Sequence, residues 1–159
     1  MESGQLTVMF ERAARRVGDL LVGRGDRIGV FVDGPNVFRD EFDVDLDEVR
    51  AIVEGDGRIA VARVYLDEHA TPGLVQAVEA RGFEVVVTSG DVDVKLAVDA
   101  SALVAGGRLD RLAIVSRDTD FKPLVETANE RGIETLAVSP GESGRSDALG
   151  NAAHESVVL

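Results

Sequence analysis

The sequence predicts an α/β protein with three layers, in which helices cover both faces of a central parallel sheet. Apolar runs of strand length alternate along the chain with segments of helical spacing. The run from Ile28 to Val32 is apolar apart from Gly29, which is typical of a strand buried on both faces. Residues 80–85 and 130–135 both contain a helix end, a glycine and a strand start, which is the short connection of a βαβ crossover.

An amphipathic helix is expected over residues 5–22, in front of the sheet. Gly23 and Gly25 end the helical pattern. We divide the chain into a helical extension, residues 1–26, and a sheet domain, residues 27–159. The wide apolar stripe of the extension indicates that it packs on the sheet domain or joins two copies as a homodimer. The stripe consists of Leu6, Met9, Phe10, Ala13, Val17, Leu20 and Leu21.

The remaining elements follow in chain order. Thr71 and Pro72 are a typical helix start, because a capping residue precedes a proline in the first turn. Residues 140–151 contain three glycines and have the least regular pattern, and residues 156–159 are expected to add a short last strand. We expect strands over residues 28–32, 59–66, 83–88, 109–116 and 133–138, and helices over residues 43–53, 71–81, 91–106 and 118–131.

Composition narrows the possible cellular locations of the protein and the possible types of metal site. No apolar stretch approaches the length of a membrane span. The N-terminal segment has charged residues among its apolar ones, which distinguishes it from a signal peptide. The chain has no cysteine, which excludes disulfides and thiolate metal sites. We therefore expect a cytoplasmic protein that does not bind membranes.

The charge is strongly acidic. There are 29 acidic and 17 basic residues, and Lys95 and Lys122 are the only lysines, so the formal net charge is −12. Such a lysine-poor, acidic composition resembles that of proteins from salt-loving organisms, where salt screens self-repulsion. The overall field opposes binding of a polyanion, so a nucleic-acid function requires a local basic rim, bound cations or high salt.

Aspartates recur where predicted parallel strands end and where the following helices begin. The carboxyl ends of parallel strands share one edge of a sheet, which is where open α/β sheets bind ligands. The turn at Gly34 and Pro35 also places Asn36 beside the first aspartate. We expect one acidic edge formed by Asp33, Asp91, Asp93, Asp118 and Asp120.

Carboxylates at one edge repel each other, and a bound hard cation such as Mg²⁺ or Mn²⁺ relieves that repulsion. Each aspartate alone also has a structural explanation. Asp118 and Asp120 suit a helix cap, and Asp91 and Asp93 suit the first turn of a helix. Convergence of three separate segments is what favours a metal site. The isolated His69 and His154 are interpreted as non-ligands.

Three segments, 32–36 (VDGPN), 91–99 (DVDVKLAVD) and 116–121 (SRDTDF), resemble the three motifs of the NYN domain family, which belongs to the PIN-like nuclease superfamily. The resemblance covers residues 27–159. It implies a PIN-like, Rossmann-like fold with parallel strands in the order 3-2-1-4-5. It also implies metal-dependent cleavage of RNA.

The resemblance further implies roles for individual residues. Asp33, Asp93, Asp118 and Asp120 would hold the metal, and Asn36 would orient Asp33 or a metal-bound water. These five residues would form the catalytic set. Ser116, Arg117 and Lys122 would bind substrate, with Arg39 as a further backbone contact, while Asp91 and Asp99 match the edges of the middle motif and are weaker candidates.

The chain departs from the family pattern at four positions. Gly90 and Asp91 stand where many relatives have lysine and glycine, which removes a positive charge. Arg117 stands where glycine is common and restores a cation to the edge. His154 lies near a position where relatives often carry aspartate.

The sequence thus predicts a metal-dependent endoribonuclease that hydrolyses RNA phosphodiesters. One alternative is an RNA-binding or protein-interaction module that does not cleave and keeps a relic acidic pocket. Few aromatic residues for base stacking and the missing lysine favour that alternative. A phosphatase of small phosphoesters is another, since an acidic metal edge also serves that reaction. A phospho-accepting receiver domain is disfavoured because Lys95 and Lys122 both lie on predicted helices.

Overall fold

The computed structural model describes residues 26–39, 44–55, 57–142 and 146–159 of the chain. The helix expected over residues 5–22, and with it the predicted dimer contact, lies outside the described residues. Among the described residues, no helix combines the length and the apolarity needed to cross a membrane.

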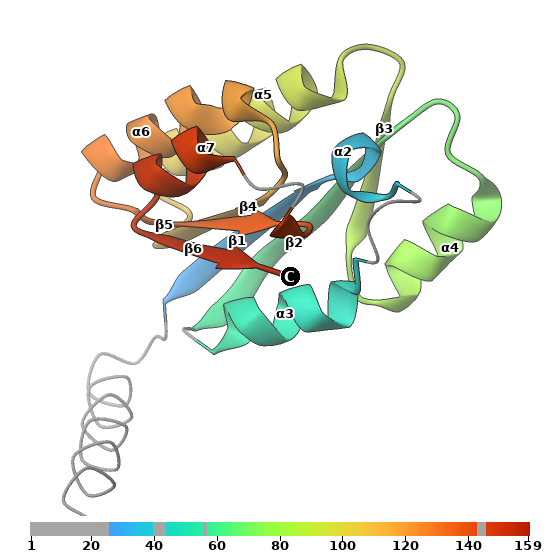
Figure 1. Ribbon diagram of the computed structural model, residues 1–159, viewed down its shortest axis with the longest axis horizontal. Helices are drawn as coiled ribbons and strands as arrows, with labels where there is room; N and C mark the ends of the chain where they lie inside the picture. Colours follow the sequence, from blue (N-terminus) through green and yellow to red (C-terminus); the bar gives the residue numbers. More distant parts are fainter. Residues whose placement is uncertain (1–25, 40–43, 56, 143–145) are drawn as a thin grey trace, which may run out of the picture.

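The centre of the molecule is a six-stranded sheet in which all neighbouring strands are parallel (Figure 1). The strand order is β3-β2-β1-β4-β5-β6, which confirms the expected order of the first five strands and adds β6 at one side. The strands are β1 (Arg27–Asp33), β2 (Arg58–Asp67), β3 (Glu84–Thr88), β4 (Arg111–Val115), β5 (Glu134–Ser139) and β6 (Glu155–Val158).

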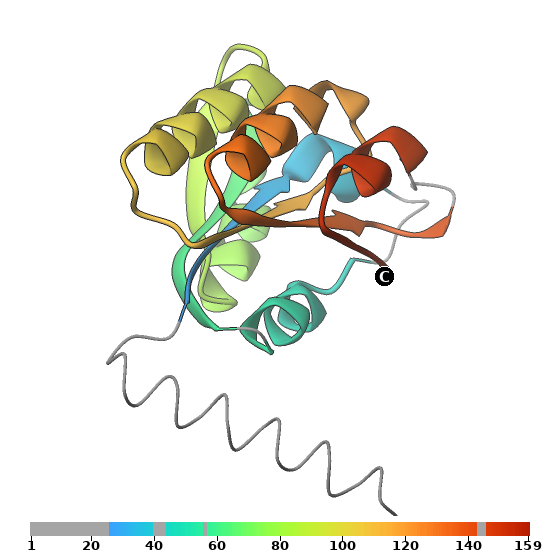
Figure 2. The same ribbon diagram turned by 90° about the vertical axis from the view of Figure 1, so that its left-hand side faces the viewer.

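Helices lie on both faces of this sheet, so the three-layer α/β prediction is confirmed. α5, α6 and α7 cover one face, and α3 and α4 lie on the other (Figures 1 and 2). The elements are α2 (Gly34–Val37), α3 (Leu46–Glu54), α4 (Pro72–Ala80), α5 (Val92–Ala105), the 3-10 turn η1 (Thr119–Phe121), α6 (Lys122–Glu130) and α7 (Asp147–Ala152).

β1 explains why the first predicted strand is apolar at almost every position. Phe31 packs in the core on the side of α5 and α6, whereas Val30 and Val32 pack in the core on the side of α3 and α4. All three are fully buried. A strand covered on both faces favours apolar side chains, so the polar residue Asp33 stands out at the carboxyl end of the strand, although it is itself buried.

Local signals set the helix boundaries. Thr71 Oγ1 accepts a hydrogen bond from the Leu74 amide, as expected of a cap before Pro72. Gly82 and Gly132 adopt positive φ angles of 82° and 76° at the ends of α4 and α6. Because side chains disfavour this conformation, glycine is suited to both helix-to-strand connections.

The turn expected at Gly34 and Pro35 is a single helical turn, α2, with Pro35 in its first positions, and it places Asn36 beside Asp33 as predicted. One local expectation was wrong. Residues 140–151, expected to be the least regular part, contain α7. Ser146 Oγ caps α7 by accepting from the Leu149 amide, and Leu149 is buried, so a cap and one apolar anchor outweigh the helix-weakening Gly150.

The close approach of α2 to β2 predicts different outcomes for two glycine substitutions. A Cβ at Gly34 would lie 2.5 Å from the Tyr65 carbonyl oxygen, whereas a Cβ at Gly73 in α4 would meet nothing within 4 Å. We expect Gly34→Ala to lower the free energy of unfolding by about 1–3 kcal/mol through overpacking. Gly73→Ala should change it by less than about 1 kcal/mol, and in the stabilising direction. Urea unfolding of both variants tests this, and equal effects would contradict the packing of α2 on β2.

Candidate metal centre

The aspartates of the three motifs meet at the carboxyl edge of the sheet. Asp33 is the last residue of β1, and Asp118 follows β4, the neighbour of β1. Asp93 lies in the first turn of α5, and Asp120 lies in η1. Strand β1 and the segments that follow β3 and β4 therefore supply carboxylates to one edge, as the order of parallel strands predicts.

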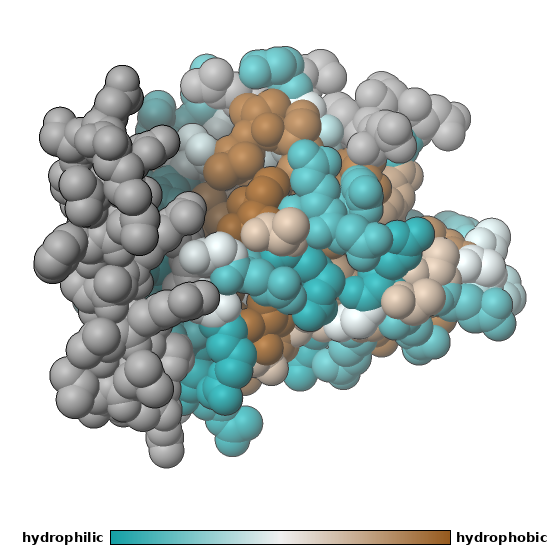
Figure 3. All heavy atoms as spheres, turned by 90° about the horizontal axis from the view of Figure 1, so that it is seen from below, coloured by the Kyte–Doolittle hydropathy of each residue, from teal (hydrophilic) through white to brown (hydrophobic). Residues whose placement is uncertain are grey.

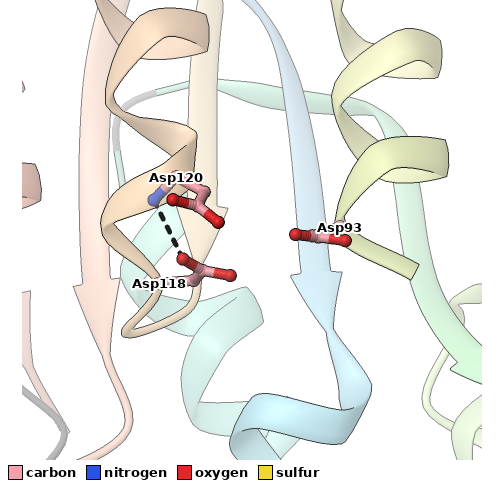
Figure 4. Close-up of side chains that lie close together, drawn as sticks. All are labelled: Asp93, Asp118 and Asp120. Carbon is pink, nitrogen blue, oxygen red and sulfur yellow. Dashed lines mark hydrogen bonds between the residues drawn. The ribbon is translucent and has the colours of Figure 1, made fainter. Parts of the chain in front are cut away.

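Three of these side chains form a cluster suited to a metal ion. One carboxylate oxygen from each of Asp93, Asp118 and Asp120 lies within 4.8 Å of the others. Asp93 reaches toward the other two from α5, while Asp118 and Asp120 come from the loop after β4 (Figure 4). Asp93 and Asp118 are half-buried and Asp120 is exposed, so the cluster opens to solvent on one side.

Hydrogen bonds fix the loop that carries two of the ligands. Ser116 Oγ accepts from the Asp118 amide at 3.0 Å, and Asp118 Oδ1 accepts from the Asp120 amide at 2.9 Å (Figure 4). The capping role considered for Asp118 is therefore real, and it coexists with membership of the cluster. A carboxylate has two oxygens, so one can hold the turn while the other serves as a ligand.

Asp33 lies behind this cluster and is almost completely buried, with 1% of its surface exposed. Its Oδ2 accepts hydrogen bonds from Asn36 Nδ2 at 2.5 Å and from Ser116 Oγ at 3.3 Å. Burial raises the pKa of Asp33 above its ordinary value, the two hydrogen bonds oppose this, and repulsion from Asp118 and Asp93 adds to the rise. Asp33 is thus electrostatically linked to the cluster without belonging to the group of three.

The donor set fits a hard divalent cation. It offers carboxylate oxygens and neither thiolate nor imidazole, which matches the preference of Mg²⁺, Mn²⁺ and Ca²⁺ for oxygen ligands. Positive charge at this point would also offset the repulsion that disfavours ionisation of Asp33.

The two weaker candidates lie outside the cluster. Asp91 precedes α5 and makes no side-chain capping hydrogen bond. Asp99 lies farther along α5, where its Oδ2 accepts from Tyr65 Oη at 2.9 Å and its Oδ1 accepts from Lys95 Nζ at 3.0 Å. Tyr65 and Lys95 were not predicted from the sequence as partners of Asp99. The four-residue spacing of Lys95 and Asp99 was the one available signal.

Three cationic residues follow strands or helices that end or begin at the carboxyl edge. Arg117 is half-buried between Ser116 and Asp118, and Lys122 begins α6 directly after η1. Lys122 lies 3.9 Å from Glu126, a distance at which an exposed ion pair contributes little. Arg39, after α2, donates a hydrogen bond to the Pro35 carbonyl at 3.1 Å. The cations predicted to contact substrate therefore follow the same strands as the aspartates.

Neither histidine belongs to the cluster. His154 Nδ1 accepts a hydrogen bond from the Thr135 amide at 3.0 Å and connects the start of β6 to β5. That contact is at the amino edge of the sheet, opposite the aspartates. His69 follows β2 and is exposed.

The NYN domain sequence profile matches residues 27–159. The chain belongs to the NYN domain family. An uncharacterised protein of Methanocaldococcus jannaschii is 41% identical over 145 residues, which cover 91% of this chain and 58% of that protein. The present chain therefore spans little more than half the length of that relative.

A solved structure supports the fold. A protein of unknown function from Vibrio parahaemolyticus superposes with a TM-score of 0.74 at 22% identity, covering 86% of this chain and 94% of that one. The NYN fold is PIN-like, as expected from the motifs, and the family is of nuclease type. The cluster of three aspartates is able to hold a metal ion in this setting.

The buried position of Asp33 predicts a pH-dependent stability. Because the pKa of Asp33 is raised in the folded protein, the unfolded chain loses this proton first as pH rises, and the folded state then loses relative stability. We expect Asp33→Asn to remove this loss, so in EDTA the variant gains stability over the parent as pH rises above the ordinary carboxyl pKa of about 4. Urea unfolding at several pH values measures the difference.

Asp110 is the matched control. Its pKa is lowered by hydrogen bonds from Arg27, so its contribution is present above the ordinary carboxyl pKa and is lost as pH falls. Asp110→Asn should therefore lose stability relative to the parent as pH rises toward the ordinary carboxyl pKa of about 4, and the difference should stay constant at higher pH. Parallel pH dependences for the two variants would contradict the electrostatic description of Asp33.

Proposed function

We propose that this protein is a metal-dependent endoribonuclease that hydrolyses RNA phosphodiesters with Mg²⁺ or Mn²⁺. The observation that carries the proposal is the convergence of Asp93, Asp118 and Asp120, from two separate segments, within ligand distance of one another. Membership of a nuclease-type family favours phosphodiester hydrolysis over the other reactions that an acidic metal site can support.

Asp93, Asp118 and Asp120 would hold the cation, with Asp33 as a fourth carboxylate close behind them. A divalent cation bound there would supply activation of water and stabilisation of charge on the phosphoryl oxygens. Asn36 donates to Asp33 Oδ2 and fixes the side chain of Asp33. Ser116 donates to the same oxygen and also accepts from the Asp118 amide, so one hydroxyl positions both carboxylates.

RNA is the proposed partner, and its phosphates would approach an acidic surface. Arg117 and Lys122 are the cationic side chains next to the cluster, and Arg39 extends the same edge. Because the formal net charge is −12, we expect binding to depend on the bound cation and on these few side chains rather than on the overall field.

Cleavage assays on a panel of single-stranded and structured RNAs, with Mn²⁺ and at high salt, test the proposal. We expect Asp93→Asn and Asp118→Asn to lower the rate at least about 100-fold, beyond the usual effect of residues that only support ligands. EDTA should abolish cleavage in the parent. Asp91→Asn is the matched control, because Asp91 begins the same helix and lies outside the cluster.

Calorimetric titration with Mn²⁺ separates the proposed nuclease from its alternatives. Cleavage by Asp93→Asn and Asp118→Asn at the parental rate would refute the mechanism. Binding of Mn²⁺ that is lost in Asp118→Asn, without turnover of any RNA, would indicate the RNA-binding or interaction module instead. Turnover of a small phosphomonoester without cleavage of RNA would indicate the phosphatase.

A further inference from the structure

A second concave site lies at the opposite edge of the sheet from the aspartates. It is a cavity of about 190 Å³ with an apolar part and a polar part. The apolar walls include Ile28, Val53, Ala113 and Leu136, and the polar walls are Arg111, Glu134, Thr135, His154 and Glu155. The apolar residues come from β1, α3, β4 and β5, close to where the strands begin. The cavity therefore forms at the amino edge, on the face of the sheet that α3 and α4 share.

The helices of this face leave the cavity open. α3 and α4 pack chiefly on β2 and β3, so the start of β5 is less covered on this side than Val138 farther along the strand, which is buried. Leu136 remains partly exposed on β5 as a result. Figure 3 shows apolar residues gathered on this face beside hydrophilic ones. An apolar surface of this kind in a layered fold is normally covered by another element.

The chain enters β1 at the rim of this cavity. The Asp26 carbonyl accepts from the Arg58 amide at 2.9 Å, and the Asp26 carboxylate accepts from Arg111 Nε at 3.0 Å. Arg111 and Ile28 both line the cavity. Residues 23–26 span at most about 14 Å when extended. The C-terminal end of the segment before them can therefore reach the opening of the cavity.

The chemistry of residues 5–22 matches the cavity. As a helix this segment would be about 27 Å long, with the apolar stripe from Leu6 to Leu21 on one side. Arg12 and Arg16 flank one side of that stripe at helical spacing, and Glu134 and Glu155 stand at the rim of the cavity. Glu155 has no ion-pair partner among the described residues, and Glu134 pairs with Arg111.

Electrostatic repulsion between two copies favours a segment of the same chain as the occupant of the cavity. Residues 1–26 contain four of the 17 basic and four of the 29 acidic residues, so the remainder of the chain carries the whole net charge of −12. Two such bodies repel each other, whereas a tethered segment acts at high effective concentration. We propose that residues 5–22 form a helix that docks its apolar stripe into this cavity of the same chain, beneath the starts of β4, β5 and β6.

Tryptophan fluorescence of the full chain tests the docking, because the sequence contains no tryptophan of its own. Phe10→Trp places a single indole in the apolar stripe, and Arg15→Trp places it on the opposite side of the same helix. We expect the Phe10→Trp variant to emit at shorter wavelength and to be quenched several-fold less by acrylamide than the Arg15→Trp variant. Leu136→Glu, added to Phe10→Trp, should restore strong quenching, with circular dichroism as the check that the domain stays folded.

A second variant at the cavity and a measurement of the oligomeric state complete the experiment. Glu155→Arg changes an exposed rim residue, so it keeps the test valid if Leu136→Glu unfolds, and it should increase quenching of the indole in Phe10→Trp. Equal quenching of the Phe10→Trp and Arg15→Trp variants would overturn the proposal. So would protection of the Phe10→Trp indole that rises with protein concentration together with sedimentation as a dimer, since a second copy would then fill the cavity.

Discussion

Repulsion among the carboxylates at one edge of the sheet is the constraint on which the rest of this structure depends. Asp33 and Asp118 leave adjacent strands, β1 and β4, and Asp93 is held by α5, whose buried residues pack against both. Apolar burial in these elements opposes the repulsion and fixes the positions of the carboxylates. Burial is the main cause of the raised pKa of Asp33, and repulsion from Asp118 and Asp93 adds to it. A site that is unfavourable when empty is favourable for a divalent cation, so the same arrangement that weakens the fold creates affinity.

Charged side chains are arranged differently at the two edges of the sheet. At the amino edge, opposite charges are paired: Arg27 contacts Asp110 at 3.1 Å, and Arg111 contacts both Asp26 and Glu134. These pairs join the starts of β1, β4 and β5 and neutralise one another. At the carboxyl edge, like charges gather. The parallel arrangement makes this separation possible, because all strand starts lie on one side and all strand ends on the other.

Much of this could be predicted from sequence, because several signals were local. The apolar run of β1, the glycines at 82 and 132 and the three aspartate motifs each have a physical cause within a few residues. What could not be predicted depends on distant partners. The grouping of Asp93, Asp118 and Asp120 without Asp33 follows from the depth at which β1 ends, and the hydrogen bond from Tyr65 to Asp99 joins β2 to α5. α7 was missed because its anchor, Leu149, is recognisable only once a core exists to bury it.

The acidic surface has a consequence for how an RNA would be held. Many arginines of the sheet domain already serve acidic neighbours: Arg27, Arg50, Arg63, Arg81 and Arg111 all form ion pairs. Each of these ion pairs has no net charge, so it does not attract a polyanion. Attraction must then be concentrated at the carboxyl edge, where a divalent cation among Asp93, Asp118 and Asp120 would offset most of their negative charge and offer phosphate oxygens a ligand position. If the proposed function holds, metal binding and RNA binding would be one coupled event, because without the cation the carboxylates would repel the phosphates that the site would act on.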